Sequence, residues 1–258
     1  MRPGACLKSR LLDSLSGKLQ LRNSRKPTLL LAGCLLAASA IPVCLAAPAV
    51  QSRTLRCGDA QYQYLLYSPA SKQPLPAILL LHGAGDHPPN FIDAWKPFAA
   101  QKHIVLIAPE LPRTFAFEAA APEMFKCVVE DAKLQSSIDP RRVYVFGHSM
   151  GGYLAYDAAT FDSEYFAAVA VHAMGIAEEY ASIVDKAKRK TPIAIYIGDQ
   201  DQLVPITRVQ RTRDLLRKAG FPVHYVELRD HDHNYYDLAG QINDDAWNFL
   251  SQYQLPNP

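Results

Sequence analysis

Long, uninterrupted apolar runs constrain the fold of this 258-residue chain more than any other feature of its sequence. They include "AILLLHG", "HIVLIAPE", "VYVFG" and "IAIYIGD", and none of them alternates apolar with polar residues. Strands that are covered on both faces have this pattern, because neither face meets water. Segments with helical spacing separate the runs, so the sequence predicts an α/β fold in which helices cover both faces of a mostly parallel sheet.

The expected elements follow one another along residues 50–258 without a repeat or a linker, which predicts one domain over 48–258. We expect an edge strand at 62–67 and buried strands at 77–83, 103–110, 142–147, 165–172, 193–199 and 223–228. We expect helices at 90–101, 124–138, 178–190 and 206–219, and a last helix that ends near Tyr253. The turn Asp139-Pro140 should end the second helix.

The first 47 residues differ from the rest of the chain. Basic residues precede a short apolar run with small residues near its end, which is the pattern of a secretory signal peptide. We expect cleavage near 46–49 and a periplasmic or secreted protein. One alternative is a retained membrane anchor, although the alanine-rich run is weakly apolar for a spanning helix. A second alternative is a lipoprotein acylated at Cys34, within the lipobox-like "LAGC".

Removal of this leader changes the net charge. Seven of the 27 basic residues and one of the 25 acidic residues lie in it, so the remainder carries a net charge of −4 at pH 7. No basic surface excess remains to favour nucleic acid or an anionic membrane as a partner. We therefore expect no nucleic-acid partner and no stable membrane insertion after cleavage.

Cys57 and Cys127 are the two cysteines that remain after the leader. An exported chain with two cysteines favours one disulfide, because its compartment is oxidising; two unpaired buried thiols are the alternative. The sequence has no C-x-x-C and no Cys/His zinc spacing. The "DHDH" segment at 230–233 lacks a third ligand elsewhere, so it is a weak metal motif and we expect no metal.

The stretch "VYVFGHSMGGYLAYDAA" carries the chemistry. A strand that passes directly into a helix must turn sharply, and the residue at the turn, Ser149, is exposed above the sheet. Small residues two positions before and after it, Gly147 and Gly151, let the backbone pass without collision. Ser149 also lies at a helix N-terminus, where backbone N–H groups favour a developing negative charge. The pattern predicts a nucleophilic serine.

A serine nucleophile needs a base and an acid, and on such a turn they follow it in the order acid, then histidine. The "GDQDQLVP" segment offers Asp199 or Asp201. We favour Asp201, which lies further into the loop, and expect Asp199 to cap the turn. The "RDHDHNYY" segment offers His231 or His233. We favour His233 for its reach, which leaves His231 behind it or facing the substrate.

The tetrahedral intermediate needs donors for its oxyanion. We expect the backbone N–H of Met150, directly after the serine, and that of Ala84, in the glycine-containing loop after the 77–83 strand. His82 is expected to brace this loop. His148 is expected to be a packing or pocket residue, and His172 a candidate pocket residue.

Together, "LLLHGAGD", "DPRRVYVFGHSMGGYLAY", "YFAAVAVHAMG", "IGDQDQLVP" and "HDHNYY" resemble the α/β-hydrolase superfamily. Within it, the chain is most similar to small secreted esterases, which include feruloyl esterases, polyhydroxyalkanoate depolymerases and dienelactone-hydrolase-like proteins. The resemblance implies the α/β-hydrolase fold, with Ser149 as nucleophile, Asp201 as acid, a late histidine as base, and the Ala84 and Met150 amides as oxyanion donors. The last loop departs from many relatives, which have a single Gly-His there.

The sequence therefore predicts an exported serine hydrolase that cleaves carboxylic esters through an acyl-enzyme and needs no cofactor. The alternatives are a serine peptidase of the prolyl-oligopeptidase-like type, whose members usually carry an extra N-terminal domain, and a non-catalytic binding protein on the same scaffold. The short spacings leave little room for a large lid domain, so we expect a site open to a small-molecule or polymer-borne ester. The acyl group, the alcohol and the oligomeric state stay open.

Overall fold

The computed structural model describes residues 48–111, 121–177 and 180–257. The predicted signal peptide lies outside the described residues. No helix within these ranges is long and apolar enough to cross a bilayer.

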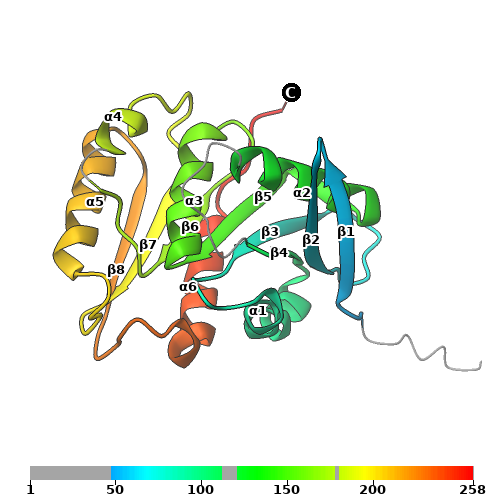
Figure 1. Ribbon diagram of the computed structural model, residues 1–258, viewed down its shortest axis with the longest axis horizontal. Helices are drawn as coiled ribbons and strands as arrows, with labels where there is room; N and C mark the ends of the chain where they lie inside the picture. Colours follow the sequence, from blue (N-terminus) through cyan, green and yellow to red (C-terminus); the bar gives the residue numbers. More distant parts are fainter. Residues whose placement is uncertain (1–47, 112–120, 178–179, 258) are drawn as a thin grey trace, which may run out of the picture. The chain divides into compact units, whose positions relative to one another are not determined.

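An eight-stranded sheet has the strand order β1-β2-β4-β3-β5-β6-β7-β8 (Figure 1). The β1–β2 and β2–β4 pairs are antiparallel, and all the other pairs are parallel. The bounds of the strands are Gln51–Cys57 (β1), Ala60–Tyr67 (β2), Leu75–Leu81 (β3), Val105–Pro109 (β4), Ile138–His148 (β5), Val169–His172 (β6), Ile193–Gly198 (β7) and Val223–Leu228 (β8).

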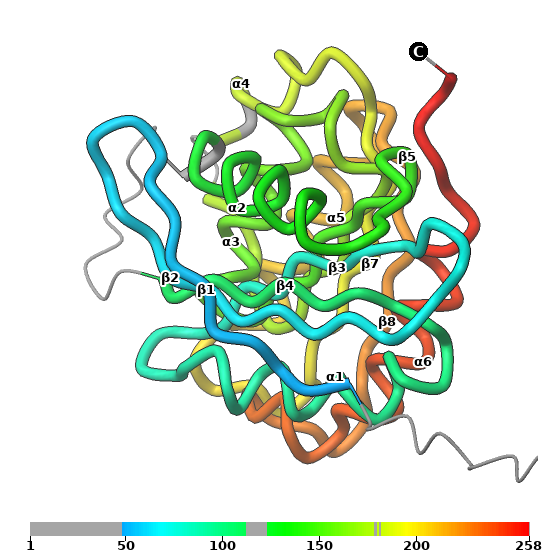
Figure 2. The backbone as a smooth tube through the Cα atoms, turned by 90° about the vertical axis from the view of Figure 1, so that its right-hand side faces the viewer, coloured from blue at the N-terminus to red at the C-terminus, as the bar shows by residue number. Residues whose placement is uncertain are grey.

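Helices cover both faces of this sheet (Figure 2). Helices α2, α3 and α5 pack on one face and α1 and α6 on the other, which gives two apolar cores. Within β3, Leu79 and Leu81 join the first core and Ile78 and Leu80 join the second, which explains why the run is apolar throughout. The bounds of the helices are Pro88–Lys102 (α1), Ala121–Gln135 (α2), Met150–Phe161 (α3), Ala181–Val184 (α4), Ile206–Lys218 (α5), Tyr235–Leu238 (η2, a 3₁₀ helix) and Ala239–Leu250 (α6).

The predicted fold is confirmed: the sheet is mostly parallel, both of its faces are covered, and the described residues include no large lid. The carboxyl ends of the parallel strands meet at one edge, where open α/β sheets bind their ligands.

Five predicted elements were wrong in detail. Of the expected 165–172 strand, only Val169–His172 form β6. The 62–67 strand is not at the edge, because β1 pairs outside it. The second helix ends at Gln135, and residues 138–140 begin β5 instead of forming a turn. The 178–190 helix shrinks to the four residues of α4, with 178–179 outside the described residues. The last helix ends at Leu250, not near Tyr253.

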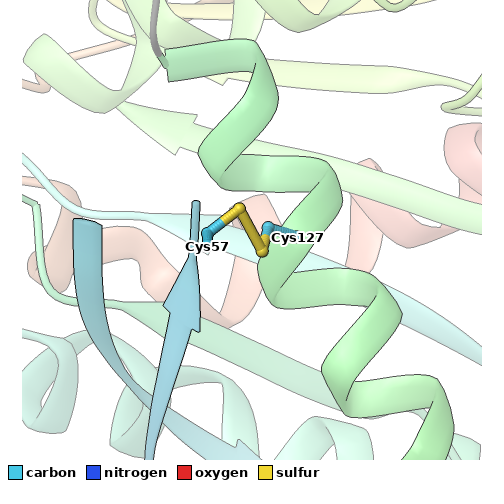
Figure 3. Close-up of a disulfide and its surroundings, with 2 residues drawn as sticks. All are labelled: Cys57 and Cys127. Atoms are coloured by element: carbon cyan, nitrogen blue, oxygen red, sulfur yellow. A yellow bond between two sulfur atoms is a disulfide. The ribbon is translucent and has the colours of Figure 1, made fainter. Parts of the chain in front are cut away.

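Cys57, at the end of β1, and Cys127, on α2, form a disulfide (Figure 3). The bond is the pairing that the sequence predicted. It closes a separation of 70 residues and ties β1, which pairs with β2 at one end of the strand order, to a helix of the first core. In the chain-entropy account, a loop of this length stabilises the fold by roughly 4 kcal/mol.

Candidate active site

Ser149 forms the turn between β5 and α3, with a positive φ of 51° and a ψ of −117°. A non-glycine residue adopts this strained conformation only where its surroundings enforce it. The two flanking glycines show the enforcement. A Cβ on Gly147 would lie 2.2 Å from the Gly151 carbonyl oxygen, and a Cβ on Gly151 would lie 2.0 Å from the Leu81 carbonyl oxygen. The close approach of three backbone segments therefore requires glycine on both sides of the serine.

His233 lies between Ser149 and Asp201. Its Nε2 is 2.9 Å from Ser149 Oγ, and its Nδ1 is 2.8 Å from Asp201 Oδ2. Because an ionised carboxylate only accepts hydrogen bonds, Nδ1–H donates to Asp201 and Nε2 is left to accept the serine O–H. The structure thus brings together the three residues that the sequence favoured, from three separate loops.

The Asp201 carboxylate is completely buried, and both of its oxygens accept hydrogen bonds. While Oδ2 accepts from His233, Oδ1 accepts from the backbone N–H groups of Leu203 and Val204, each at 2.9 Å. Asp201 therefore caps its own turn, a role that the sequence assigned to Asp199, which lies exposed at the surface. These bonds hold the carboxylate in position toward His233.

The Ala84 and Met150 residues line the same cavity of about 320 Å³. Met150 is the first residue of α3, so its N–H has no acceptor within the helix. The imidazole of His82, which also lines the cavity, donates from Nδ1 to the Gly83 carbonyl at 2.9 Å and accepts the N–H of Leu111 at Nε2. His82 therefore braces the loop that carries Ala84, as predicted.

The rim of this cavity is acidic, because Asp86 and Glu110 line it. Asp86 accepts hydrogen bonds from the Tyr236 hydroxyl, from Asn90 and from the backbone N–H of His87. Although partial burial opposes it, this bonding lowers the pKa of Asp86 below its ordinary value, so the group is ionised at neutral pH. The Asp86–Tyr236 contact joins the loop after β3 to η2. It spans 150 residues of sequence, and no local pattern could have predicted it.

We call Ser149, His233 and Asp201 the triad. Three other histidines form a second group next to it, which we call the histidine chain: His148, His172 and His231. His148 Nδ1 lies 2.9 Å from His172 Nδ1, and His172 Nε2 lies 3.2 Å from His231 Nε2. His172, predicted to line the pocket, is instead completely buried. His231, the alternative base or substrate-facing residue, is buried, and its ring contacts His172. His148 is a packing residue, whose ring centre lies 5.1 Å from that of His233.

The two histidines of the 230–233 segment thus have separate partners. His231 contacts His172, and His233 contacts Ser149 and Asp201. Across the ranges that the structure describes, no three His, Cys, Asp or Glu side chains are arranged to hold a metal ion.

Comparisons with known proteins identify the family and the fold. The model of the dienelactone hydrolase family matches residues 64–246. A search of curated proteins found no significant match. Among solved structures, a thermostable esterase has a TM-score of 0.66 at 20% identity; 80% of this chain aligns with 63% of that one. A protein from Bacteroides ovatus, provisionally named a dipeptidyl aminopeptidase IV, has a TM-score of 0.67 at 17% identity over 80% of this chain and 36% of that one.

An S-formylglutathione hydrolase from Staphylococcus aureus has a TM-score of 0.66 at 16% identity, over 78% of this chain and 98% of that one. At these identities, the three similarities show the fold alone. The chain spans less than two thirds of the length of the first two proteins.

Proposed function

Since the chain belongs to the dienelactone hydrolase family, we propose that it is a serine hydrolase that cleaves carboxylic ester bonds. Ser149 is the nucleophile, His233 the general base and acid, and Asp201 the group that orients and stabilises His233. The observation that carries the proposal is the continuous line of contacts from Asp201 through His233 to Ser149, at 2.8 and 2.9 Å. Both distances suit proton transfer without rearrangement.

The reaction takes place in two halves. Ser149 Oγ attacks the ester carbonyl while its proton passes to His233 Nε2, and the backbone N–H groups of Ala84 and Met150 stabilise the oxyanion. His233 then protonates the departing alcohol, which leaves an acyl group on Ser149. In the second half, His233 takes a proton from water while the water oxygen attacks the acyl carbonyl. His233 then returns the proton to Ser149 Oγ as the acyl–serine bond breaks, which releases the carboxylic acid and restores the serine.

Whether the protein cleaves esters or amides is tested by comparing the hydrolysis of p-nitrophenyl acetate with that of aminoacyl p-nitroanilides. We expect ester turnover to exceed anilide turnover, and S149A to lose at least about a thousandfold in kcat. Anilide turnover above ester turnover would assign a serine peptidase. A folded protein whose Ser149 fails to react with a fluorophosphonate would assign a non-catalytic binding protein.

The identity of the ester is open to a graded test. A cavity of about 320 Å³ directly beside the proposed oxyanion donors suits a short acyl or alcohol group. Esters of increasing acyl length, methyl ferulate, an acetylated sugar and a polyester film separate small-molecule from polymer-borne substrates. We expect kcat/KM to fall with acyl length, and a rise through long chains would contradict a small site.

Export is part of the same proposal. The basic and apolar composition of residues 1–47 and the Cys57–Cys127 disulfide both favour an oxidising compartment. Mass spectrometry of the protein from the periplasm and medium of a bacterial host should show a chain that begins after residue 46 or 49. An uncut chain in the membrane fraction would mean a retained anchor, and a chain that begins with an acylated Cys34 would mean a lipoprotein.

A further inference from the structure

We propose that His172 is a positioning residue for the hydrolytic reaction. Through ring-to-ring hydrogen bonds with His148 and His231, it fixes the loop that carries His233. The inference rests on the proposed function, because it assigns His172 a role in aligning that site.

Strand register places the three rings. His148 and His172 are the last residues of the neighbouring parallel strands β5 and β6, and they occupy paired positions in the sheet. His231 follows β8, two strands further on, in the loop that returns over the carboxyl edge. The histidine chain therefore crosses from the strand that carries the serine turn to the loop that carries the base.

Each triad residue is connected to the histidine chain through a backbone hydrogen bond or through its neighbours in the sequence. The N–H of Ser149 donates to the His172 carbonyl at 2.9 Å. The N–H of Gln200, next to Asp201, donates to the His231 carbonyl at 2.9 Å. His233 is separated from His231 by one residue. A displacement of His231 would therefore move the base and disturb the acid loop together.

The backbone around His231 leaves little room for adjustment. A Cβ on Gly198 would lie 2.0 Å from the His231 carbonyl oxygen, so the loop rests directly on the end of β7. On the other side, the buried Tyr235 ring lies 5.8 Å from the His172 ring and 5.9 Å from the His148 ring. The Tyr235 hydroxyl is held by Asn243 of α6. The histidine chain thus packs against β7 and Tyr235, with His172 at its centre.

The two bonds of His172 require a defined arrangement of protons. A neutral imidazole has one N–H donor and one acceptor nitrogen, so His172 donates to one neighbour and accepts from the other. A leucine at this position would leave ring nitrogens of His148 and His231 buried without a partner, which is costly. Hydrogen bonds between polar side chains, rather than apolar packing, therefore connect His148, His172 and His231.

The two links can be separated by substitution. In H172Q, the amide reaches about as far as the imidazole Nε2 and can keep the bond to His231. In H172N, the amide reaches about as far as Nδ1 and keeps only the bond to His148. We expect H172N to lower kcat for p-nitrophenyl acetate about 10- to 100-fold with KM nearly unchanged, because a displaced base affects the chemical step. H172Q should retain most of the wild-type kcat.

The matched control is H224Q. His224 lies on β8 and bonds Asp245 at 2.8 Å, so its substitution also removes a hydrogen-bonded imidazole, but away from the site. We expect its kcat to equal the wild-type value. Thermal unfolding checks that each variant is folded. Wild-type kcat in H172N, or an equal loss of kcat in H172N and H172Q, would overturn the proposal.

A second measurement does not depend on activity or on the folding of a variant. In protein labelled with [¹⁵N]histidine, His172 should show one protonated and one unprotonated ring nitrogen at pH 7 and should not titrate between pH 8 and pH 5.5. Titration of His172 within that range would overturn the proposal. Failure of wild-type Ser149 to react with a fluorophosphonate would refute the proposed function instead, and the spectrum would still report on the histidine chain.

Discussion

Two groups of side chains lie next to each other at the carboxyl edge of the sheet, and both depend on histidine. In the triad, His233 is partly exposed and bonds a buried carboxylate. In the histidine chain, the rings are buried and the two ring nitrogens of His172 bond two other imidazole rings. The partner therefore decides the chemistry: a carboxylate stabilises a protonated imidazole, whereas burial disfavours the charge on His148 and His172.

The protonation behaviour of the histidine chain follows from its surroundings. Burial, together with the positive charge that His233 can carry, lowers the pKa of His148 to about 4. Burial and the charges of His148, His231 and His233 hold the pKa of His172 well below its ordinary value. His148 and His172 are therefore neutral in the proposed step in which His233 becomes an imidazolium, so they add no repulsion to it.

The largest expected effect comes from substituting, one at a time, the two histidines that lie in the same loop. H233Q should lower kcat about 10⁴- to 10⁶-fold, because it removes the imidazole that contacts Ser149 Oγ and accepts its proton in the proposed reaction. H231Q should lower kcat only about 10- to 100-fold, because it affects the position of His233 and not its chemistry. The measurement is single-turnover acylation by p-nitrophenyl acetate. A greater loss in H231Q than in H233Q would reverse the assignment of the base.

A smaller effect is expected at the acid. D201N should lower kcat about 10³- to 10⁴-fold, because an amide can no longer orient and stabilise the His233 imidazolium. D199N is the matched control. Its side chain is exposed on the same loop, so we expect wild-type kinetics and an unchanged unfolding midpoint. If Asp201 is the acid, kcat must be much lower in D201N than in D199N, and similar kcat values for the two variants would contradict this role.

Much of this edge could be predicted from the sequence, because local rules govern it. The apolar runs and the glycine–serine turn have requirements that act over a few residues, and the order of acid and histidine follows the chain. The start of β5 was predicted wrongly for a local reason. Asp139-Pro140 has the composition of a turn, but the Asp139 carboxylate bonds the Arg142 side chain at 2.6 Å. The ladder between β3 and β5 also shifts register beside this segment, which accommodates the missing proline N–H.

The histidine chain could not have been predicted in the same way. Its members lie 24 and 59 residues apart, and they meet only because β6 is placed between β5 and β7. Strand order and register come from tertiary packing, which the single sequence does not show. The role of Asp199 was misjudged for a related reason: either carboxylate could cap the turn, and only the position of His233 decides which one is buried.

The neutral state of His148 predicts a pH dependence of stability. The pKa of His148 is about 4 in the folded protein and near the ordinary value of about 6.5 when unfolded, so unfolding takes up protons between these values. The free energy of unfolding is therefore greatest above about pH 6.5 and falls by up to about 3 kcal/mol toward pH 4. Urea unfolding of wild type and H148Q at pH 7 and pH 4.5 tests this. The loss should be smaller in H148Q, and an equal loss would contradict a neutral His148.

The same reasoning applied to a buried acid gives the opposite sign and a smaller effect. Burial raises the pKa of Asp157 to about 6, although the Tyr180 hydroxyl donates to its carboxylate. The folded protein therefore binds a proton more tightly than the unfolded chain, and Asp157 lowers stability as the pH rises from about 4 to about 6. D157N keeps an acceptor for Tyr180 and removes the titration. Its stability relative to wild type should rise by up to about 2 kcal/mol across that window and stay level above it. A difference that does not change with pH would mean that the carboxylate ionises freely. Burial would then not explain the shifted pKa values of both His148 and Asp157, and it would not be what distinguishes these two residues from the triad.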